Sequence, residues 1–169
     1  QEQGVAFWDT QNEFTQDRLS LIKRTFCKGA TDDEFALFIG GAKRTRLSPE
    51  ARQIYMVKRW DSKEGRDVMS VQASIDGFRV VAERTGQMDG ELGPFWCDDS
   101  GKWVDVWLSD QPPAAAKVGV LRKGCREPFW GVAKYSEYVP KQAQAFMWNK
   151  MPATMIAKCA ESLGKRKAF

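Results

Sequence analysis

The amino-acid sequence predicts an α+β protein in which antiparallel strands pack one face against helices. Segments with apolar residues at spacings of three and four alternate along the chain with short segments rich in β-branched and aromatic residues. Turns rich in glycine, proline and aspartate separate the strand-like segments, as in hairpins. A length of 169 residues suffices for one domain with its own core, so we predict a single domain over residues 1–169.

Two helices are predicted near the start of the chain. The first spans residues 15–27, where apolar residues recur at spacings of three and four. Thr31 begins the second helix as an N-cap, with Glu34 three residues later as in a capping box. We expect the second helix to be short and buried and to end near Gly40-Gly41.

A β-hairpin is predicted next, from two strands at residues 52–60 and 67–75 and the turn-forming sequence DSKEGR between them. The second strand alternates in character. Its core-facing residues would be Met69, Val71, Ala73 and Ile75. The residues facing outward would be Val68, Ser70, Gln72 and Ser74.

The rest of the chain is predicted to hold a helix, three strands and a final helix. The first of these helices opens at Asp76-Gly77 and stops at Gly86. The strands are expected at residues 102–108, 116–123 and 129–135. The last segment is helical from Met151, with Pro152 in the first turn, where proline is tolerated.

The final helix places one arginine where a cation is unexpected. At 100° per residue, the apolar face consists of Pro152, Met155, Ile156, Cys159 and Leu163. The polar residues opposite are Lys150, Thr154, Lys158, Glu161 and Lys165. Arg166 falls near the apolar face, where an unpaired guanidinium would be costly. Either the helix unwinds after Gly164, or Arg166 reaches toward an anion at an interface.

Positive charge is concentrated in two segments. The whole chain carries a formal net charge of +4. Residues 43–66 alone hold eight basic and three acidic residues, and residues 150–169 hold five basic residues and one acidic residue. Such concentration suits an anionic partner, and a solvated basic face is the alternative interpretation.

Several enzyme classes are excluded or disfavoured. The chain has no histidine, which excludes a His-based triad or a His-ligated metal, and it lacks both common glycine-rich nucleotide motifs. The four cysteines form no Cys-x-x-Cys pair and are expected to be reduced thiols. A magnesium nuclease would need convergent carboxylates, for which the candidates are Asp98, Asp99, Asp105 and Asp110. Their turn and strand settings favour solvated positions, so we expect no enzyme, no metal and no cofactor.

The sequence shows no signal for a membrane. No apolar run approaches the roughly 18 residues that a spanning helix needs. The starting sequence QEQGVAFWDT has neither the basic end nor the apolar run of a signal peptide. We therefore expect a cytosolic protein without a membrane partner.

The combination of basic and aromatic residues is the strongest functional signal. The chain has seven Trp, ten Phe and three Tyr beside 26 Lys and Arg. Single-stranded nucleic acid is held by this combination, because cations follow the phosphates and flat rings stack on bases. Most of the rings must belong to the core, and composition does not identify which ring would stack.

Four motifs resemble the RecT/Bet family of phage single-strand annealing proteins, and the likeness covers about residues 14–169. They are SIDGFR at 74–79, RQIY at 52–55, AAAKVGVLRK at 114–123 and the closing segment from MWNKMP to RKAF. The resemblance implies a protein that binds single-stranded DNA without ATP, anneals complementary strands and assembles into rings or helical filaments. It also implies the β-β-β-α core of annealing recombinases, with additional helices and a β-hairpin.

The resemblance implies partners and a location as well. The ligands would be single-stranded DNA and the annealed duplex intermediate, held in a positively charged groove. A phage exonuclease and a host single-strand binding protein are the expected protein partners, in the cytoplasm of a bacterial host. Family members usually continue into a C-terminal tail that engages partner proteins, and we expect this tail to be absent from the chain.

Some site residues follow from the resemblance. The family's Trp and Pro at the entrance of the last helix fall on Trp148 and Pro152, and its late Arg falls on Arg166, which would contact the DNA backbone. The basic residue before the Ile-Tyr pair corresponds to Arg52.

The last helix departs from the family pattern at Ala153 and Cys159, where the family has basic residues, and Lys150 and Lys158 are expected to compensate. The predicted phosphate-binding residues are Arg52, Lys58, Arg59, Arg79, Lys150, Lys158, Lys165 and Arg166. Neutral hydrogen bonds to the DNA backbone are expected from Gln72 and Ser74. Acidic residues that could meet a neighbouring subunit are Asp9, Glu13 and Asp17. The alternative function is protection of single-stranded DNA without annealing.

Overall fold

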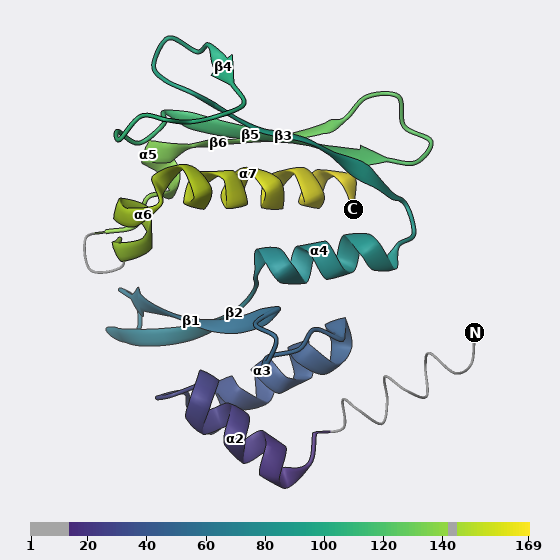
Figure 1. The fold of residues 1–169 in the computed structure, drawn as a ribbon. Coiled ribbons are helices and arrows are strands. Elements are labelled where there is room, and N and C mark those ends of the chain that lie inside the picture. The colour runs from purple at the N-terminus through teal and green to yellow at the C-terminus, as the bar shows by residue number, and fades with distance from the viewer. Residues whose placement is uncertain (1–13, 142–144) are drawn as a thin grey trace. The chain divides into compact units, whose positions relative to one another are not determined.

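The computed structural model describes residues 14–141 and 145–169, and its helices and antiparallel strands confirm the α+β class (Figure 1). The chain divides into two compact units, a first one that ends at Gly77 and a second one from Phe78 to Phe169. Each unit has its own sheet, of two strands in the first and four strands in the second. The single domain over residues 1–169 stays a prediction.

Both helices of the first unit begin where the sequence predicts. α2 spans Gln16–Phe26, and its N-cap Thr15 accepts a hydrogen bond from a backbone N–H of the first turn. α3 spans Asp32–Thr45 and begins with the predicted capping box. The Thr31 hydroxyl accepts from the Glu34 N–H, and the Glu34 carboxylate accepts from the Thr31 N–H.

The predicted end of α3 is wrong. The helix continues through Gly40-Gly41 to Thr45, and its C-cap is Arg46 in the left-handed region, with φ 54°. Gly41 is buried against the hairpin, where an added Cβ would meet the Val71 side chain at 3.7 Å. Packing of this turn, together with the helix-forming residues that follow, outweighs the low helix propensity of two glycines.

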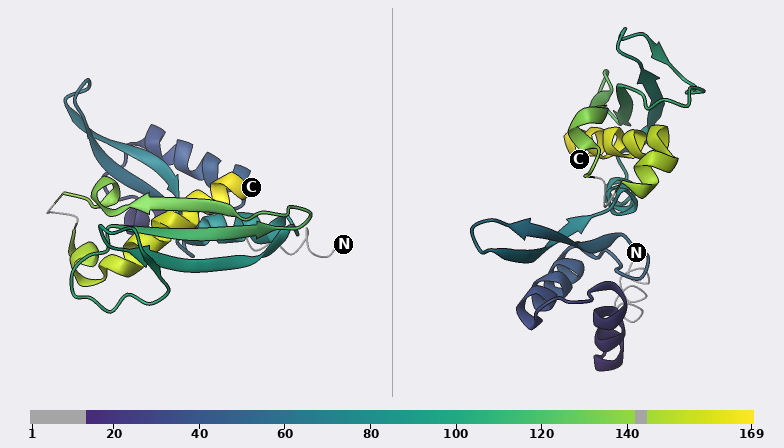
Figure 2. Two further views of the ribbon diagram at one scale, coloured as in Figure 1. Left: turned by 90° about the horizontal axis from the view of Figure 1, so that it is seen from above. Right: turned by 90° about the vertical axis from the view of Figure 1, so that its left-hand side faces the viewer.

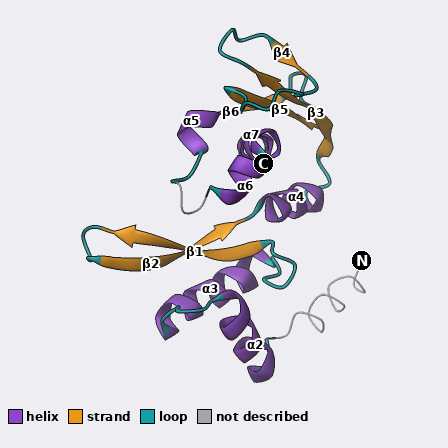
Figure 3. Cartoon of the chain, turned by 60° about the vertical axis from the view of Figure 1, so that its left-hand side comes forward, coloured by secondary structure: helices purple, strands orange, loops and turns teal. Residues whose placement is uncertain are grey.

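The predicted hairpin is present, with β1 over Ile54–Asp61 and β2 over Arg66–Ala73 in uninterrupted antiparallel register (Figure 3). Val71 faces α3 because it lies beside Gly41, and Met69, two residues away, shares this face as predicted. Val71 remains exposed, since one helix covers only part of a two-stranded sheet.

The SIDGF motif begins α4, which confirms the predicted helix but spans Ile75–Arg84, so Ile75 belongs to this helix and not to the preceding strand as predicted. The Ser74 hydroxyl accepts from the Gly77 N–H (3.2 Å) and donates to the carbonyl of Arg52 (2.6 Å). Gly77 cannot carry a side chain, because a Cβ there would lie 2.2 Å from the carbonyl oxygen of Gln53. The turn before β1 is therefore locked to the start of α4.

The second unit holds an antiparallel sheet in the order β4-β3-β5-β6. The strand bounds are Met88–Cys97 for β3, Trp103–Val104 for β4, Ala115–Arg122 for β5 and Phe129–Lys134 for β6. β5 and β6 confirm two predicted strands. The strand predicted at 102–108 is wrong beyond residues 103–104, and β3 has no counterpart among the predictions.

β3 escapes sequence reasoning because it contains Gly90, Gly93 and Pro94, which usually interrupt strands. Its pairing with β5 shifts register at two places, between Met88 and Gly90 and between Leu92 and Phe95. These irregularities absorb the glycines and the proline while the ladder continues on both sides.

Three helices complete the second unit: α5 (Tyr135–Tyr138), α6 (Phe146–Lys150) and α7 (Pro152–Ala168). Only α7 is predicted from the sequence, and Pro152 occupies its first turn as expected. α7 runs along one face of the sheet formed by β3, β5 and β6 (Figures 1 and 2). The strands β3, β5 and β6, followed by α7, give the β-β-β-α order that the resemblance implies.

The core of the second unit lies between α7 and β5. Ile156 and Ala160 are fully buried and pack with the alternate β5 residues Ala116, Val118 and Val120. α7 also lies close to β6, since a Cβ on Gly131 of β6 would fall 2.1 Å from the carbonyl oxygen of Ala160 on α7. Small residues therefore set the distance between helix and sheet.

Candidate nucleic-acid interface

The hairpin of the first unit carries a polar and basic face on the side away from α3. The register places Tyr55 opposite Gln72 and Arg59 opposite Val68, and these positions alternate with those that face α3. Tyr55 and Arg59 are exposed, and Gln72 is half-buried. We call this surface the hairpin outer face; it consists of Tyr55, Val57, Arg59, Val68, Ser70 and Gln72.

Two predicted residues lie at the base of the hairpin. Arg52 occupies a turn with φ 58°, its N–H donates to the carbonyl of Pro49 (3.0 Å), and its side chain is exposed. Ser74 is different, because its hydroxyl already donates to the Arg52 carbonyl and accepts from the Gly77 N–H. Arg52 can therefore offer its guanidinium to a phosphate, whereas the Ser74 proton is used within the fold.

Lys58 lies on the opposite face of the hairpin from Arg59, since its register partner is Met69. Its Nζ is 3.5 Å from a carboxylate oxygen of Asp67, and both side chains are exposed. An exposed pair of this kind contributes little to stability. The ammonium of Lys58 therefore remains available to a phosphate at small cost.

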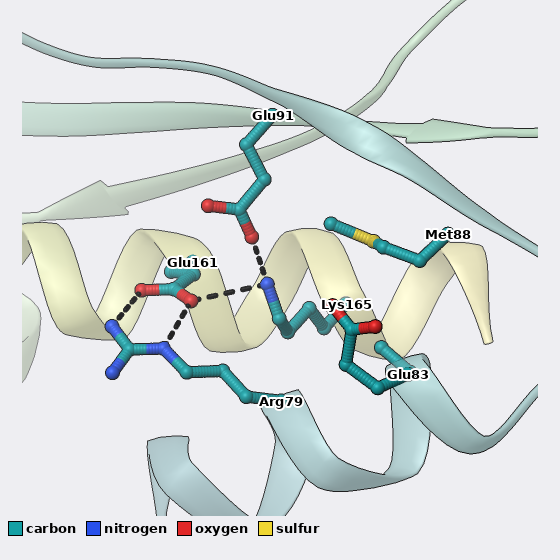
Figure 4. Close-up of a pocket in the computed structure, with 7 residues that line it drawn as sticks. Arg79, Glu83, Met88, Glu91, Glu161 and Lys165 are labelled. Carbon is teal, nitrogen blue, oxygen red and sulfur yellow. Dashed lines mark hydrogen bonds and ion pairs between the residues drawn. The ribbon is translucent and has the colours of Figure 1, made fainter.

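Four charged side chains from α4, β3 and α7 form one ion-pair network in the second unit (Figure 4). Arg79 donates from Nε and a terminal nitrogen to the two carboxylate oxygens of Glu161, both at 2.8 Å. The Lys165 ammonium lies 3.0 Å from Glu161 and also donates to Glu91. These four residues line a pocket of about 220 Å³, and the others that line it are Ala82, Glu83 and Met88.

The network decides what Lys165 and Arg79 can do. The Lys165 side chain is 4% exposed and pairs with two carboxylates, so it is no surface cation. Burial lowers the pKa of Lys165 to about 8, and the positive charge of Arg79 acts in the same direction. Arg79 is 50% exposed, but both of its bonds to Glu161 neutralise its charge. We therefore leave both residues out of the proposed phosphate contacts.

The wheel drawn from the sequence misplaces part of α7. Glu161 and Lys165 fall on its polar side, yet both are buried because α4 and β3 bring countercharges to them. The helix also does not unwind after Gly164, since it continues to Ala168. Arg166 is exposed within an intact helix, so the unwinding alternative is wrong, and its contact with an anion stays a prediction.

Trp148 belongs to the core. Its ring is buried in the cluster beneath the sheet and meets Tyr135 edge-on, with ring centroids 5.6 Å apart and planes at 66°. In this position the indole cannot stack on a base. The tryptophan at the entrance of the last helix therefore supports the fold.

Three of the predicted cations of the second unit remain available to bind a phosphate. Lys150 at the end of α6 and Lys158 and Arg166 on α7 are exposed, and no carboxylate within the described ranges pairs with them. The Arg166 guanidinium lies over the ring of Phe78, 5.0 Å from its centroid. A cation–π contact of this kind leaves the guanidinium N–H groups able to bind an anion.

Sequence reasoning missed Glu91 and the contact of Phe78 with Arg166. Glu91 lies on β3, the strand that was not predicted because it contains glycines. Phe78 contacts Arg166 only because α4 packs beside α7. Neither periodicity nor motif spacing connects residues so distant in sequence. A second cation among rings was also missed: the Lys117 ammonium lies 4.6 Å from the Trp103 ring centroid and 4.9 Å from that of Trp130.

The acidic residues give the nuclease alternative no support. In the part of the chain that the structure describes, no three or more His, Cys, Asp or Glu residues gather to hold a metal ion. Asp98 accepts from the N–H (2.9 Å) and hydroxyl (2.5 Å) of Ser100 in a turn. Asp17 is exposed in the first turn of α2, whereas Asp9 and Glu13 lie outside the described residues. None of the helices in residues 14–141 and 145–169 has the length and apolar character to span a bilayer.

Comparison with known proteins gives the family. A search of curated proteins found no match to this chain. A comparison with protein families matches the RecT family over residues 12–169, which is nearly the whole sequence. The match includes the SIDGFR motif, the hairpin and α7, which together carry the features described above. The chain therefore belongs to the RecT family, a family of DNA-binding proteins that anneal single strands in recombination.

Proposed function

We propose that this chain is an ATP-independent annealing protein that binds single-stranded DNA and pairs complementary strands during phage recombination. The observation that carries the proposal is a set of exposed cations without a carboxylate partner in the described residues: Arg52, Arg59, Lys150, Lys158 and Arg166. Unpaired surface cations favour polyanions, because a phosphate replaces bulk counterions instead of an internal partner.

The mechanism needs no covalent step. Contacts to phosphate are blind to sequence, so any strand can bind and be compared with any other. The Watson–Crick edges stay free when the cations hold only the backbone. Pairing proceeds when two bound strands match, and the annealed product is retained because it offers more phosphates to the same surface.

Assembly and partners belong to the same proposal. A ring or helical filament of many copies would hold a longer alignment than the few nucleotides that one chain covers. Asp17 on α2 is a candidate to meet a neighbour's basic surface, because it is an exposed carboxylate. A phage exonuclease would supply single strands, a host single-strand binding protein would compete for them, and the cytoplasm of the bacterial host is the expected location.

The test is the rate at which two complementary, dye-labelled oligonucleotides anneal without ATP across a salt series. We expect the wild-type chain to accelerate annealing and Arg166→Ala to accelerate it less. The slope of log affinity against log salt should become shallower by about 0.7 in this variant, as for one lost phosphate contact on a single strand. Arg126→Ala is the matched control, since Arg126 is an exposed arginine of the same unit outside the proposed surface. Tight binding of each strand without acceleration would instead identify a protective binding protein.

A further inference from the structure

One large ring of the first unit is left in water. Trp60, the penultimate residue of β1, is 67% exposed, whereas the tryptophans of the second unit are buried or half-buried. Leaving an indole exposed forgoes the free energy that its burial would give. The exposed ring of Trp60 is therefore available to a ligand.

The end of the hairpin holds Trp60 in place. Opposite Trp60, β2 supplies Asp67, so the residue is part of the paired ladder. The turn beyond it is fixed by Asp61, whose carboxylate accepts from the N–H of Lys63 (2.8 Å) and of Glu64 (3.2 Å). The Asp61 carbonyl accepts from the Gly65 N–H (2.8 Å). Trp60 is thus presented by an ordered element, which lowers the entropic cost of binding a ligand against its ring.

Exposed basic residues are neighbours of Trp60 in the hairpin. Arg59 precedes it on the opposite face, and Lys63 lies in the turn; both are exposed, and no carboxylate in the described residues pairs with either. Lys58 shares the face of Trp60, and the carboxylate near its ammonium is that of the exposed Asp67. A flat ring beside unpaired cations is the combination that binds a nucleobase by stacking and its phosphate by charge.

We propose that Trp60 is a stacking platform for a base of single-stranded DNA at the end of the hairpin. The inference rests on the proposed function and adds to it a contact with the base itself, through its π-face. Stacking leaves the Watson–Crick edge of the base free, so a strand held in this way can still be searched by its complement. The other cation and ring cluster, around Lys117, offers no such surface, because its own lysine occupies the rings.

The experiment compares two fluorescein-labelled probes of equal length, an oligothymidylate and a base-free oligomer of the same sugar-phosphate backbone. Trp60→Ala should weaken binding of the oligothymidylate by about 5- to 150-fold, the range that stacking on an aromatic residue gives. Its affinity for the base-free probe and its salt slope should stay those of the wild type. Trp60→Phe keeps a flat ring and should restore most of the affinity.

Phe146→Ala is the matched control, because Phe146 is an exposed ring (72%) outside the hairpin, and it should bind both probes as the wild type does. Equal loss on both probes, or no loss on either, overturns the stacking role. A change in the sedimentation mass of DNA-free Trp60→Ala also overturns it, because the ring would then face a second copy of the chain. A wild-type chain that binds neither probe overturns the proposed function itself.

Discussion

Arg166 is kept available by an aromatic ring. Its guanidinium lies over the ring of Phe78, 5.0 Å from the centroid, and this cation–π contact holds the exposed side chain beside the ring. Lys165, the preceding residue, points to Glu91 and Glu161 and is buried. Two adjacent basic residues of one helix thus have different roles, because 100° of rotation separates their side chains.

We predict that Phe78 positions Arg166. Phe78→Leu should weaken binding of single-stranded DNA by about 2- to 5-fold, the value of an exposed cation–π contact, while leaving the salt slope unchanged because Arg166 keeps its charge. Fluorescence anisotropy with a labelled oligonucleotide measures both quantities. In the background of Arg166→Ala, Phe78→Leu should have no further effect on affinity; an additive loss would show that the ring acts independently. Val81→Ala, on the same helix and partly exposed, is the control.

Lys165 should make stability depend on pH in the alkaline range. The pKa of Lys165 is lowered by burial from 10.5 to about 8, so between these values the unfolded chain binds the proton and the folded chain does not. The contribution of Lys165 to the free energy of unfolding therefore rises with pH across this window. Below about pH 8 the folded chain carries the buried ammonium, and the destabilisation that this burial causes is fully present. Urea unfolding gives the free energy of unfolding of the wild type and of Lys165→Met at several pH values. The wild-type value minus the variant value should increase with pH; a decrease would mean that Glu91 and Glu161 hold the ammonium charged.

At the scale of elements, the contact of α7 with its sheet depends on two glycines, Gly131 on β6 and Gly164 on α7. A Cβ on Gly131 would lie 2.1 Å from the Ala160 carbonyl oxygen, and one on Gly164 would lie 2.8 Å from a methyl carbon of Val120. The first clash is with backbone and cannot be relieved by a rotamer change. The helix could make room only by moving away from the sheet that it covers.

Gly131→Ala should therefore lower the free energy of unfolding by about 3 kcal/mol or more, at the upper end of overpacking costs. Gly40→Ala is the matched control, since Gly40 lies in the interior of α3 with nothing within 4 Å of an added Cβ. That change should stabilise the chain by about 0.5–1 kcal/mol through helix propensity. Chemical denaturation followed by circular dichroism measures both free energies of unfolding. If Gly131→Ala changed the free energy of unfolding by no more than Gly40→Ala does, the packing argument would be refuted.

The start of α3 is also tied to the hairpin. Glu34 accepts from the N–H of Thr31 within the capping box, and its second carboxylate oxygen accepts from the N–H of Met69 on β2 (2.7 Å). The capping and backbone bonds lower the pKa of Glu34 from its usual value. The Glu34 side chain thus satisfies one backbone N–H at the start of α3 and one on β2.

Thr31→Ala should cost about 1 kcal/mol of stability, as for loss of an N-cap. Glu34→Ala should cost more, because it removes the capping bond and also leaves the Met69 N–H without its acceptor. Asp33→Ala, in the same first turn, should cost only a few tenths of a kcal/mol through the helix dipole. Thermal unfolding of the three variants gives the order, and a Glu34 variant no less stable than the Thr31 variant would remove the link to β2 from the account.

At the scale of the whole molecule, exposed cations occur in both units. Arg52, Lys58 and Arg59 lie in the first unit, and Lys158 and Arg166 lie in the second. If both surfaces hold the same DNA, losses of charge from the two units should add. Arg59→Ala and Lys158→Ala should each make the salt slope shallower by about 0.7, and the double variant by about 1.4.

Filter binding or anisotropy at several salt concentrations measures these slopes. A double variant that behaves like one of the single variants would restrict the phosphate contacts to one unit. Because the salt dependence reports charge and the base-free probe reports stacking, the contributions of Arg59 and Trp60 can be separated on the same hairpin.

Much of the fold could be predicted because its signals are local. The capping box at Thr31, the turn between β1 and β2 and the helical start at the SIDGF motif depend on residues within a few positions of one another. β3 could not be predicted, since its bulges at glycine are tolerated only because β5 and β4 pair on either side of it. The burial of Trp148 likewise depends on Tyr135 and the sheet above it.

The sequence by itself determined the α+β class, the hairpin, the last helix, the concentration of positive charge and the family to which the chain belongs. Only the tertiary structure decided which cations face solvent. Lys165 is bonded to a carboxylate 74 positions away and Arg79 to one 82 positions away, whereas Arg59, Lys158 and Arg166 pair with no carboxylate of residues 14–141 and 145–169. The physical reason is that a charge is neutralised or left free by partners brought from distant segments, and helical periodicity contains no information about those partners.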